Sequence, residues 1–298
     1  MEIFDAHCDT ISELLGRGKN LSENNLHIDM KRLSEYSSYT QVFAAFVAPE
    51  YADCAMERTK AIINKFYYEA VKNKIAVCKS YTDWENAKEN VKAFLSLEGG
   101  DAIQSVSDVS ELYGMGIRMI ALTWNYKNKI ACGVMEKEDS GLSEFGAEVI
   151  RQMNRLGIII DVSHLSEKSF WDVLKISKKP VCASHSNLKS VKNHLRNLTD
   201  EQFIKIKETG GVAGINFYPP FFGDDIKDIV CHVGRFLSLG GEDNIGIGTD
   251  FDGVDCLPCG ILGVQDMEKV IKMLPYSTEI REKIAFRNFL RVIKAHNC

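Results

Sequence analysis

The chain repeats one pattern from end to end: a short apolar run rich in β-branched residues, followed by a polar stretch with helical spacing. Near-continuous apolar runs of this length are typical of strands buried on both faces, as in parallel sheets. The eight runs are Ile3–Phe4, Gln41–Ala48, Lys92–Leu97, Ile117–Thr123, Gly157–Val162, Pro180–Ser184, Gly211–Phe217 and Asn244–Thr249. Eight strands alternating with helices predict an α/β protein of the (β/α)₈ (TIM) barrel type.

The stretches between the runs carry apolar residues at helical spacing. They predict helices over Asp53–Asn73, Gly146–Leu156, Glu167–Ile176, Asp200–Lys207 and Ile226–Leu239. Thr199 stands directly before one of them and has the hydroxyl expected of an N-cap. An open doubly wound sheet is the alternative architecture, but no GxGxxG motif follows a strand. Because no Pro-, Gly- or Ser-rich linker divides the chain, we expect one domain over residues 1–298.

The composition excludes several classes of protein. The chain has 298 residues, 45% of them hydrophobic, and a net charge of −5. This much apolar surface can offset the entropy lost on ordering, so disorder is not expected. There is no run of about eighteen apolar residues, and the acidic balance differs from the clustered Lys and Arg of nucleic-acid-binding surfaces. We therefore expect neither a membrane nor a nucleic acid among the partners.

The cysteines and the first residues predict a reducing, cytoplasmic location. The nine cysteines, of which the last is Cys298, are scattered along the chain. Cys78 and Cys182 lie in apolar runs, where Cys behaves as a small hydrophobic residue. The start MEIFDAHCDT has neither the basic nor the apolar region of a secretory signal. Cys256 and Cys259 form one CxxC pair, which we interpret as loop thiols, with a metal site or a redox disulfide as the alternative.

Polar side chains follow the apolar runs where the strands are expected to end. His7 and Asp9 follow the first run, and Glu98, His164 and His185 follow the third, fifth and sixth. In a barrel all these ends meet at one mouth, and residues two apart on a strand share a face. Imidazole and carboxylate groups are ligands of zinc and similar divalent ions. Together the five residues predict a metal centre.

Five ligands exceed one tetrahedral site with an open position, so two ions are expected to share them. Glu98 is the candidate bridging carboxylate, and two ions a few ångströms apart can hold a hydroxide between them and polarise a carbonyl. Each residue alone also has a structural interpretation. A single His at a strand end is more often structural than a ligand, and Glu98 before two glycines could open a turn. It is the set of five that indicates metal.

Other polar residues near these positions are interpreted as structural. Asp5 and Asp252 are candidates to cap backbone amides, and Asp161 is a candidate to orient His164. The histidines without a place at a strand end are read as surface or core residues: His27, His232 and His296.

The order and strand placement of these motifs give the chain a family resemblance over nearly its whole length. The motifs are Asp5–Thr10, Leu97–Gly100, Asp161–Ser166, Ala183–Ser186, Arg196-Asn197, Gly211–Tyr218, Gly248–Gly253 and Asn288–Ile293. They resemble the membrane (renal) dipeptidase family of zinc dipeptidases, within the metal-dependent hydrolase barrels. The resemblance implies one zinc on His7, Asp9 and Glu98. It implies a second zinc on Glu98 and the two later histidines, His164 and His185.

The resemblance also implies roles for three further residues and a substrate. Asp250 would handle protons beside the metals and contact the substrate, Arg196 would grip the terminal carboxylate, and Tyr218 would help shape the site. The expected activity is hydrolysis of dipeptides with a free C-terminal carboxylate, with tolerance of a D-residue there. Alternatives are another hydrolase on the same barrel (deaminase, lactonase or phosphoesterase) or a non-catalytic metal-containing binding protein. A homodimer is possible.

Two positions depart from the family pattern. Mammalian members carry a substrate-contacting His after Leu-Thr at the end of the fourth strand, where this chain has Trp124. The indole can donate one hydrogen bond but cannot take a proton, and Asn125 and His194 are the candidates to replace that histidine. Cys8 stands where the family has Asn, and its side chain is expected to point away from the metals. We do not expect the family's membrane label to transfer to this chain.

Overall fold

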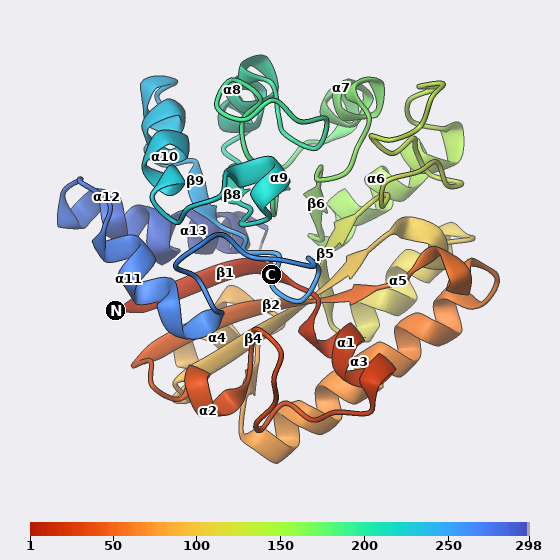
Figure 1. The fold of residues 1–298 in the computed structure, drawn as a ribbon. Helices are drawn as coiled ribbons and strands as arrows, with labels where there is room; N and C mark the ends of the chain where they lie inside the picture. The colour runs from red at the N-terminus through yellow and green to blue at the C-terminus, as the bar shows by residue number, and fades with distance from the viewer. Residues whose placement is uncertain (297–298) are drawn as a thin grey trace.

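Eight parallel strands close into a barrel in the computed structural model, which describes residues 1–296 (Figure 1). Their order is β2-β1-β9-β8-β7-β6-β5-β4, and pairing of β2 with β4 closes the ring. The strands are β1 (Glu2–Cys8), β2 (Ser38–Phe46), β4 (Val91–Glu98), β5 (Ile117–Ala121), β6 (Ile159–Asp161), β7 (Val181–Ala183), β8 (Val212–Ile215) and β9 (Ile245–Ile247). A two-residue strand, β3 (Ala76–Val77), pairs with β4 outside the ring. The barrel prediction is confirmed, and the chain does not form the open doubly wound sheet.

The five helices predicted from apolar spacing all form and end within two residues of their expected positions. They are α3 (Ala55–Asn73), α6 (Glu144–Leu156), α7 (Glu167–Ile176), α8 (Asp200–Glu208) and α10 (Asp228–Ser238). Thr199 caps α8 as predicted, since its hydroxyl accepts the backbone N–H of Gln202 at 3.1 Å. The Gln202 side chain accepts the backbone N–H of Thr199 in return, at 2.8 Å. Local sequence therefore determines where this helix begins.

Shorter helices complete the outer layer and are not predicted by the sequence pattern, because a helix of few turns shows little apolar period. They are α1 (Thr10–Arg17), α2 (Met30–Leu33), α4 (Tyr81–Asn86), α5 (Val106–Gly114), α9 (Pro219–Phe222), α11 (Met267–Lys272), α12 (Thr278–Glu282) and α13 (Asn288–Ala295). Short 3₁₀ helices form at η1 (Pro49–Cys54), η2 (Gly100–Ala102) and η3 (Val264–Asp266), and a π-helix forms at η4 (Lys283–Arg287). Over residues 1–296, every helix is too short or too polar to be a membrane span.

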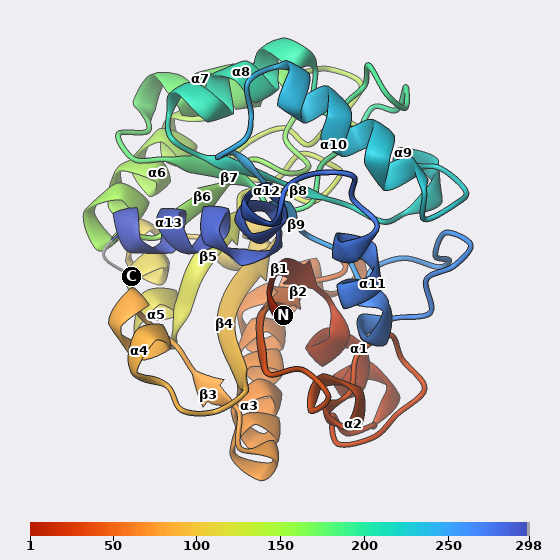
Figure 2. The same cartoon turned by 90° about the vertical axis from the view of Figure 1, so that its left-hand side faces the viewer.

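Apolar side chains fill the amino-terminal part of the barrel, and the last helix covers them. The cluster includes Phe4, Phe94, Met119 and Val212, each from a different strand. Phe289 of α13 belongs to the same cluster and stacks on Phe4 with ring centroids 5.5 Å apart, and Figure 2 shows α13 lying against the strands. Packing therefore occupies this part of the barrel, and the predicted ligands lie at the carboxyl ends of the strands.

A bulge in β1 turns one predicted ligand toward the interior. β1 pairs in register with β2 up to Asp5, and the register then shifts before Cys8. Ala6 packs inside the barrel with the apolar cluster, whereas Cys8 belongs to the outer core. The segment between Asp5 and Cys8 thus holds one residue more than the matching segment of β2, and the imidazole of His7 within it reaches the ligands of other strands. Bulges of this kind commonly re-aim a side chain beside a functional site.

The cysteines that the structure describes are unpaired. Cys78 and Cys182 are buried, as the apolar runs predict, and Cys256 and Cys259 are exposed with free thiols. Cys298 lies outside the described residues.

Candidate metal centre

Six side chains with metal-binding groups meet at the carboxyl ends of the strands: His7, Asp9, Glu98, His164, His185 and Asp250. They come from the ends of β1 and β4 and from the segments that follow β1, β6, β7 and β9. No more than 8% of any of these residues is exposed. The structure therefore places all five predicted ligands together and adds Asp250 to them.

Glu98 stands between two groups of donors and offers one oxygen to each. Its Oε2 lies 3.2 Å from Nε2 of His7. The same nitrogen of His7 lies 3.6 Å from Oδ2 of Asp9, and we call His7 and Asp9 the β1 pair. Its Oε1 lies 2.8 Å from Nε2 of His164 and 3.7 Å from Nε2 of His185; we call these the histidine pair. A carboxylate placed in this way can bridge two cations.

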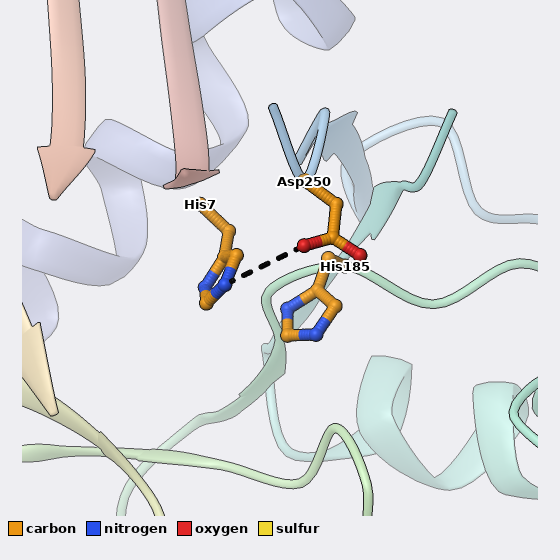
Figure 3. Close-up of side chains that lie close together, drawn as sticks. All are labelled: His7, His185 and Asp250. Carbon is orange, nitrogen blue, oxygen red and sulfur yellow. Dashed lines mark ion pairs between the residues drawn. The ribbon is translucent and has the colours of Figure 1, made fainter. Parts of the chain in front are cut away.

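Asp250 lies beside His7 and His185 (Figure 3). Its Oδ1 is 3.8 Å from Nε2 of His7, and donor atoms of Asp250, His7 and His185 all lie within 4.8 Å of one another. The other carboxylate oxygen, Oδ2, accepts a hydrogen bond from Nδ2 of Asn216 at 2.8 Å. This contact leaves Oδ1 directed at the centre. The sequence analysis assigns no role to Asn216, although it lies within the Gly211–Tyr218 motif and directly after β8.

A hydrogen bond fixes which nitrogen of His164 faces the centre. Nδ1 of His164 lies 2.8 Å from Oδ1 of Asn125. An amide oxygen can only accept, so Nδ1 carries the proton and Nε2 presents a lone pair to Glu98. Asn125 is thus a contact of a candidate ligand, 39 residues away in the sequence.

A hydroxyl and a buried carboxylate orient His185 in the same way. Oγ of Ser184 donates to Oδ2 of Asp161 and accepts from Nδ1 of His185 at 2.6 Å. The expectation that Asp161 orients His164 is therefore corrected. Oδ1 of Asp161 accepts the backbone N–H groups of Ser163 and Ser184, both at 2.9 Å, and these bonds turn the carboxylate toward β7.

The resulting arrangement fits bound cations. Nε2 of His164 and Nε2 of His185 lie 2.8 Å apart, and with both Nδ1 atoms protonated neither has a proton to donate to the other or to Glu98. On the other side, Nε2 of His7 and Oδ1 of Asp9 are buried without a hydrogen-bond partner. Unpaired buried polar atoms cost about 1–3 kcal/mol each. A divalent ion in each donor group would satisfy them, and nitrogen and carboxylate oxygen are ligands that zinc accepts.

The two donor groups differ in protonation when no metal is bound. Burial opposes charge on His7, but the carboxylates of Glu98 and Asp9 outweigh it and hold the pKa of His7 well above its usual value. Burial and the charge of Glu98 raise the pKa of Asp9 to about 8. Burial lowers the pKa of His164 to about 4 and holds the pKa of His185 well below its usual value. At neutral pH the β1 pair holds protons and the histidine pair is neutral.

Two of the six side chains are held on unusual backbone. His164 and Asp250 have φ angles of 67° and 63°, in the left-handed region that costs a residue other than glycine about 1–3 kcal/mol. Gly253 packs against the same loop, where a Cβ would lie 2.2 Å from Oδ2 of Asp9 and 2.5 Å from Oδ1 of Asp250. A side chain at position 253 would therefore displace two of the six groups.

A cavity of about 340 Å³ opens onto the centre, and Arg196, Tyr218 and Phe221 form one of its walls. Arg196 is buried, and its guanidinium lies 5.5 Å from the ring centroid of Phe221. Its Nη atoms make only long hydrogen bonds, 3.5 Å to Ser186 and 3.4 Å to His185. Among residues 1–296 no carboxylate pairs with it, and its Nε is unpartnered. A buried, unpaired guanidinium at a cavity wall is suited to an anionic group of a ligand.

One of the two departures from the family pattern, Trp124, lies at this cavity, and the other, Cys8, does not. Trp124 and Asn125 both line the cavity. Nδ1 of His194 accepts the backbone N–H of Arg196 at 3.1 Å, so that nitrogen is engaged with the backbone. Cys8 is fully buried in the outer core.

The residues interpreted as structural have structural partners. Asp5 accepts the backbone N–H of His7 at 3.3 Å and of Thr249 at 2.9 Å. Asp252 accepts the backbone N–H of His27 at 2.7 Å, and Nδ1 of His27 accepts that of Asp252 at 2.9 Å. Two further histidines are buried and bonded to backbone carbonyls: His232 and His296.

Comparison with known proteins places the whole chain in one group. Residues 1–297 match the family model described as membrane dipeptidase, peptidase family M19. An uncharacterized dipeptidase of Schizosaccharomyces pombe is 30% identical over 307 aligned positions, covering 91% of this chain and 73% of its own length. An uncharacterized protein of Klebsiella pneumoniae is 33% identical, covering 74% of this chain and 89% of its own length.

Solved structures agree with this. The dipeptidase AC, a metallopeptidase of family M19, superposes with a TM-score of 0.92 at 25% identity, over 100% of this chain and 99% of its own. A metallopeptidase from Rhodobacter sphaeroides, liganded with a phosphinate mimic of the dipeptide L-Ala-D-Ala, has the same fold. It gives a TM-score of 0.90 at 24% identity over 99% of both chains.

Proposed function

This chain belongs to the membrane dipeptidase family, peptidase family M19, and from that premise we propose that it hydrolyses dipeptides with a free C-terminal carboxylate by means of two zinc ions. Membership makes it a metallopeptidase whose substrates are small peptides. The observation that carries the finer proposal is the position of Glu98, with one oxygen facing the β1 pair and the other facing the histidine pair.

In this proposal His7, Asp9 and Glu98 would hold one zinc ion, and Glu98, His164 and His185 would hold the other. Bound zinc lowers the pKa of water toward neutrality and polarises a carbonyl. The protein fixes the donors for this task. Asn125 and Ser184 keep Nε2 of each member of the histidine pair free of a proton, and neutral imidazole nitrogen is the form that binds metal.

Asp250 is the proposed general base and acid. Its Oδ1 faces the centre while Asn216 holds Oδ2, so one oxygen is free to take a proton from the attacking water and return it to the leaving amine. Burial, together with the charge of Glu98, raises the pKa of Asp250 against the opposing effect of His7. A raised pKa makes the carboxylate a stronger base at neutral pH.

Arg196 is the proposed site for the substrate's terminal carboxylate. Its guanidinium is buried at the cavity wall without a carboxylate partner from residues 1–296, and a bidentate carboxylate would supply one. Tyr218 lies in the same wall, with its ring 4.9 Å from Phe221. Because the carboxylate ends at this wall, longer peptides should fit poorly. Tolerance of a D-residue at the C-terminal position is proposed from the family resemblance.

The test is metal analysis of the purified protein together with a substrate panel. We expect about two zinc ions per chain and hydrolysis of L,L- and L,D-dipeptides, with little activity on tripeptides or dipeptide amides. The panel includes lactones, phosphoesters and aminopurines. Activity on these alone would reject the dipeptidase proposal in favour of another hydrolase, and binding of dipeptides without cleavage would indicate a non-catalytic protein.

A further inference from the structure

We propose that Trp124 determines which N-terminal residue a dipeptide substrate can carry, because its indole separates the reaction cavity from a second, largely apolar cavity. This inference rests on the dipeptidase function proposed above and specifies its substrate preference. It predicts that the protein favours small N-terminal residues such as Gly and Ala.

Two cavities meet at Trp124. The reaction cavity has a volume of about 340 Å³, and the neighbouring cavity has a volume of about 190 Å³. Val47, Pro49, Tyr126 and Lys127 are among the residues that line the neighbouring cavity. Among the residues that the structure describes, Trp124 is the one that lines both. Its side chain is thus part of the partition between them.

Aromatic contacts hold the indole in this position. Its ring centroid lies 5.5 Å from that of Phe46, 6.4 Å from that of Tyr126 and 6.5 Å from that of His164. Phe46 lines the reaction cavity, so Phe46 and Trp124 form a continuous apolar surface on that side. Aromatic pairs at these separations stabilise a fixed ring arrangement by about 0.5–1.5 kcal/mol each.

The backbone on either side of Trp124 is also fixed. The hydroxyl of Thr123 donates to the carbonyl of His164 at 3.4 Å, and the carbonyl of Asn125 accepts the N–H of Met135 at 2.8 Å. Gly133 packs so closely that a Cβ there would lie 2.5 Å from the carbonyl oxygen of Trp124. The backbone that carries the indole is therefore held on both sides, which limits how far the partition can shift when a bulky ligand group meets it.

The position of the other cavity wall determines which end of the substrate meets Trp124. Arg196 and Phe221 follow β7 and β8, whereas Phe46 ends β2 and Trp124 follows β5. These two strands flank β4, which carries Glu98. A dipeptide with its carboxylate at Arg196 and its scissile carbonyl beside Glu98 places its N-terminal residue against Phe46 and Trp124.

The experiment compares Phe-Ala with Ala-Ala as substrates of the wild type and of Trp124→Ala. Removal of the indole joins the two cavities, so the ratio of kcat/KM for Phe-Ala over Ala-Ala should rise about ten-fold or more, since apolar pockets discriminate side-chain size by about 10- to 200-fold. The matched control is Lys127→Ala, which widens only the neighbouring cavity and should leave the ratio unchanged. Trp124→Leu should raise the same ratio by a smaller factor, and this variant replaces Trp124→Ala in the test if Trp124→Ala does not fold. An unchanged ratio in a folded Trp124 variant overturns the inference.

A binding measurement separates this inference from the proposed function. Dissociation constants of Ala-Ala and Phe-Ala are measured by calorimetry in the Asp250→Asn background, with and without Trp124→Ala. The inference requires the affinity for Phe-Ala to rise about ten-fold relative to Ala-Ala when the indole is removed. If the wild type cleaves no dipeptide, the proposed function fails, and this affinity ratio alone supports or overturns the role of Trp124.

Discussion

The β1 pair and the histidine pair face opposite oxygens of the same carboxylate, yet the fold builds them differently. The β1 pair combines one imidazole with one carboxylate and has Asp250 beside it. The histidine pair consists of imidazoles alone, and each has its Nδ1 fixed by a neighbouring side chain, Asn125 or Ser184. In the β1 pair, the charges of neighbouring groups determine how the donor atoms are protonated. In the histidine pair, hydrogen bonds to Nδ1 determine which ring nitrogen is free to bind a cation.

The supporting carboxylates show the same contrast. Asp5 and Asp161 are both buried strand residues bonded to a hydroxyl on a neighbouring strand segment. The hydroxyl of Ser184 continues to the ring of His185. Beyond Asp5, the hydroxyl of Thr249 contacts backbone groups: it donates to the carbonyl of His7 at 3.4 Å and accepts the N–H of Phe251 at 3.2 Å. A hydrogen bond between a buried carboxylate and a hydroxyl therefore orients a candidate ligand, His185, in the histidine pair. Beside the β1 pair, the same kind of bond mainly links two strand segments.

The largest effect is expected from removing the one group that both sides share. Glu98→Ala should lose both ions, and because metal ions contribute several kcal/mol of transition-state stabilisation, activity should fall by more than about 10,000-fold. Metal content per chain and kcat/KM are measured together. Glu111→Ala removes an exposed carboxylate on α5 and is the control. Retention of two ions by Glu98→Ala would contradict a bridging role.

Asp250→Asn tests whether Asp250 handles protons or only binds metal. The amide keeps the size of the side chain but cannot accept a proton, so turnover should fall by between about 100- and 10,000-fold while both ions remain bound. Metal content and kcat are compared with the wild type. Loss of the ion on the β1 side would instead assign Asp250 as a ligand, as its position within 4.8 Å of His7 and His185 permits. A near-normal rate would exclude the proton role.

Much of this centre could be predicted because the candidate ligands stand at or directly after the ends of the strands that the apolar runs predict. In a parallel barrel the strand ends converge, so polar residues directly after apolar runs, such as Glu98 and His185, are expected to meet. The prediction for His7 and Asp9 assumed simple alternation along a strand, whereas a bulge after Asp5 re-aims His7. Sequence alone does not indicate that bulge, because it appears only in the register between β1 and β2.

The supporting contacts could not be predicted, because they depend on loop packing between distant segments. Asn125 reaches His164 across 39 residues, and Asp161 turns to Ser184 because two backbone amides hold it there. Gly253 lies where a Cβ would meet two carboxylates, which only coordinates reveal. Pattern and periodicity predict the strands, while these contacts arise only once the barrel has closed.

A smaller effect is expected from the two hydroxyls that distinguish the two sides. Ser184→Ala removes the acceptor of Nδ1 of His185, so affinity for one of the two ions should fall by about 10- to 100-fold. Thr249→Val removes the hydroxyl that bonds Asp5 and the backbone of His7 and Phe251 but no imidazole nitrogen, so metal affinity should stay within a few-fold while stability falls by about 1–3 kcal/mol. Zinc titration with a competing chelator and thermal unfolding of the metal-free protein check both. Equal losses of affinity would show that the two supports act alike.

The last prediction needs no substitution at a hydroxyl and compares the protonation of the two sides most directly. Without metal, the pKa of Asp9 is about 8 and that of His7 lies well above its usual value, so an ion entering the β1 pair at neutral pH must displace protons. The pKa of His164 is about 4, so at neutral pH the histidine pair carries no proton that an entering ion would displace.

Between about pH 6 and 8, metal affinity at the β1 pair should rise about ten-fold per pH unit for each proton displaced, and metal affinity at the histidine pair should not change with pH. His164→Ala and Asp9→Ala isolate the two sides, and calorimetry in buffers of different ionisation enthalpy counts the protons. Equal proton release from both variants would contradict the difference in protonation between the two pairs.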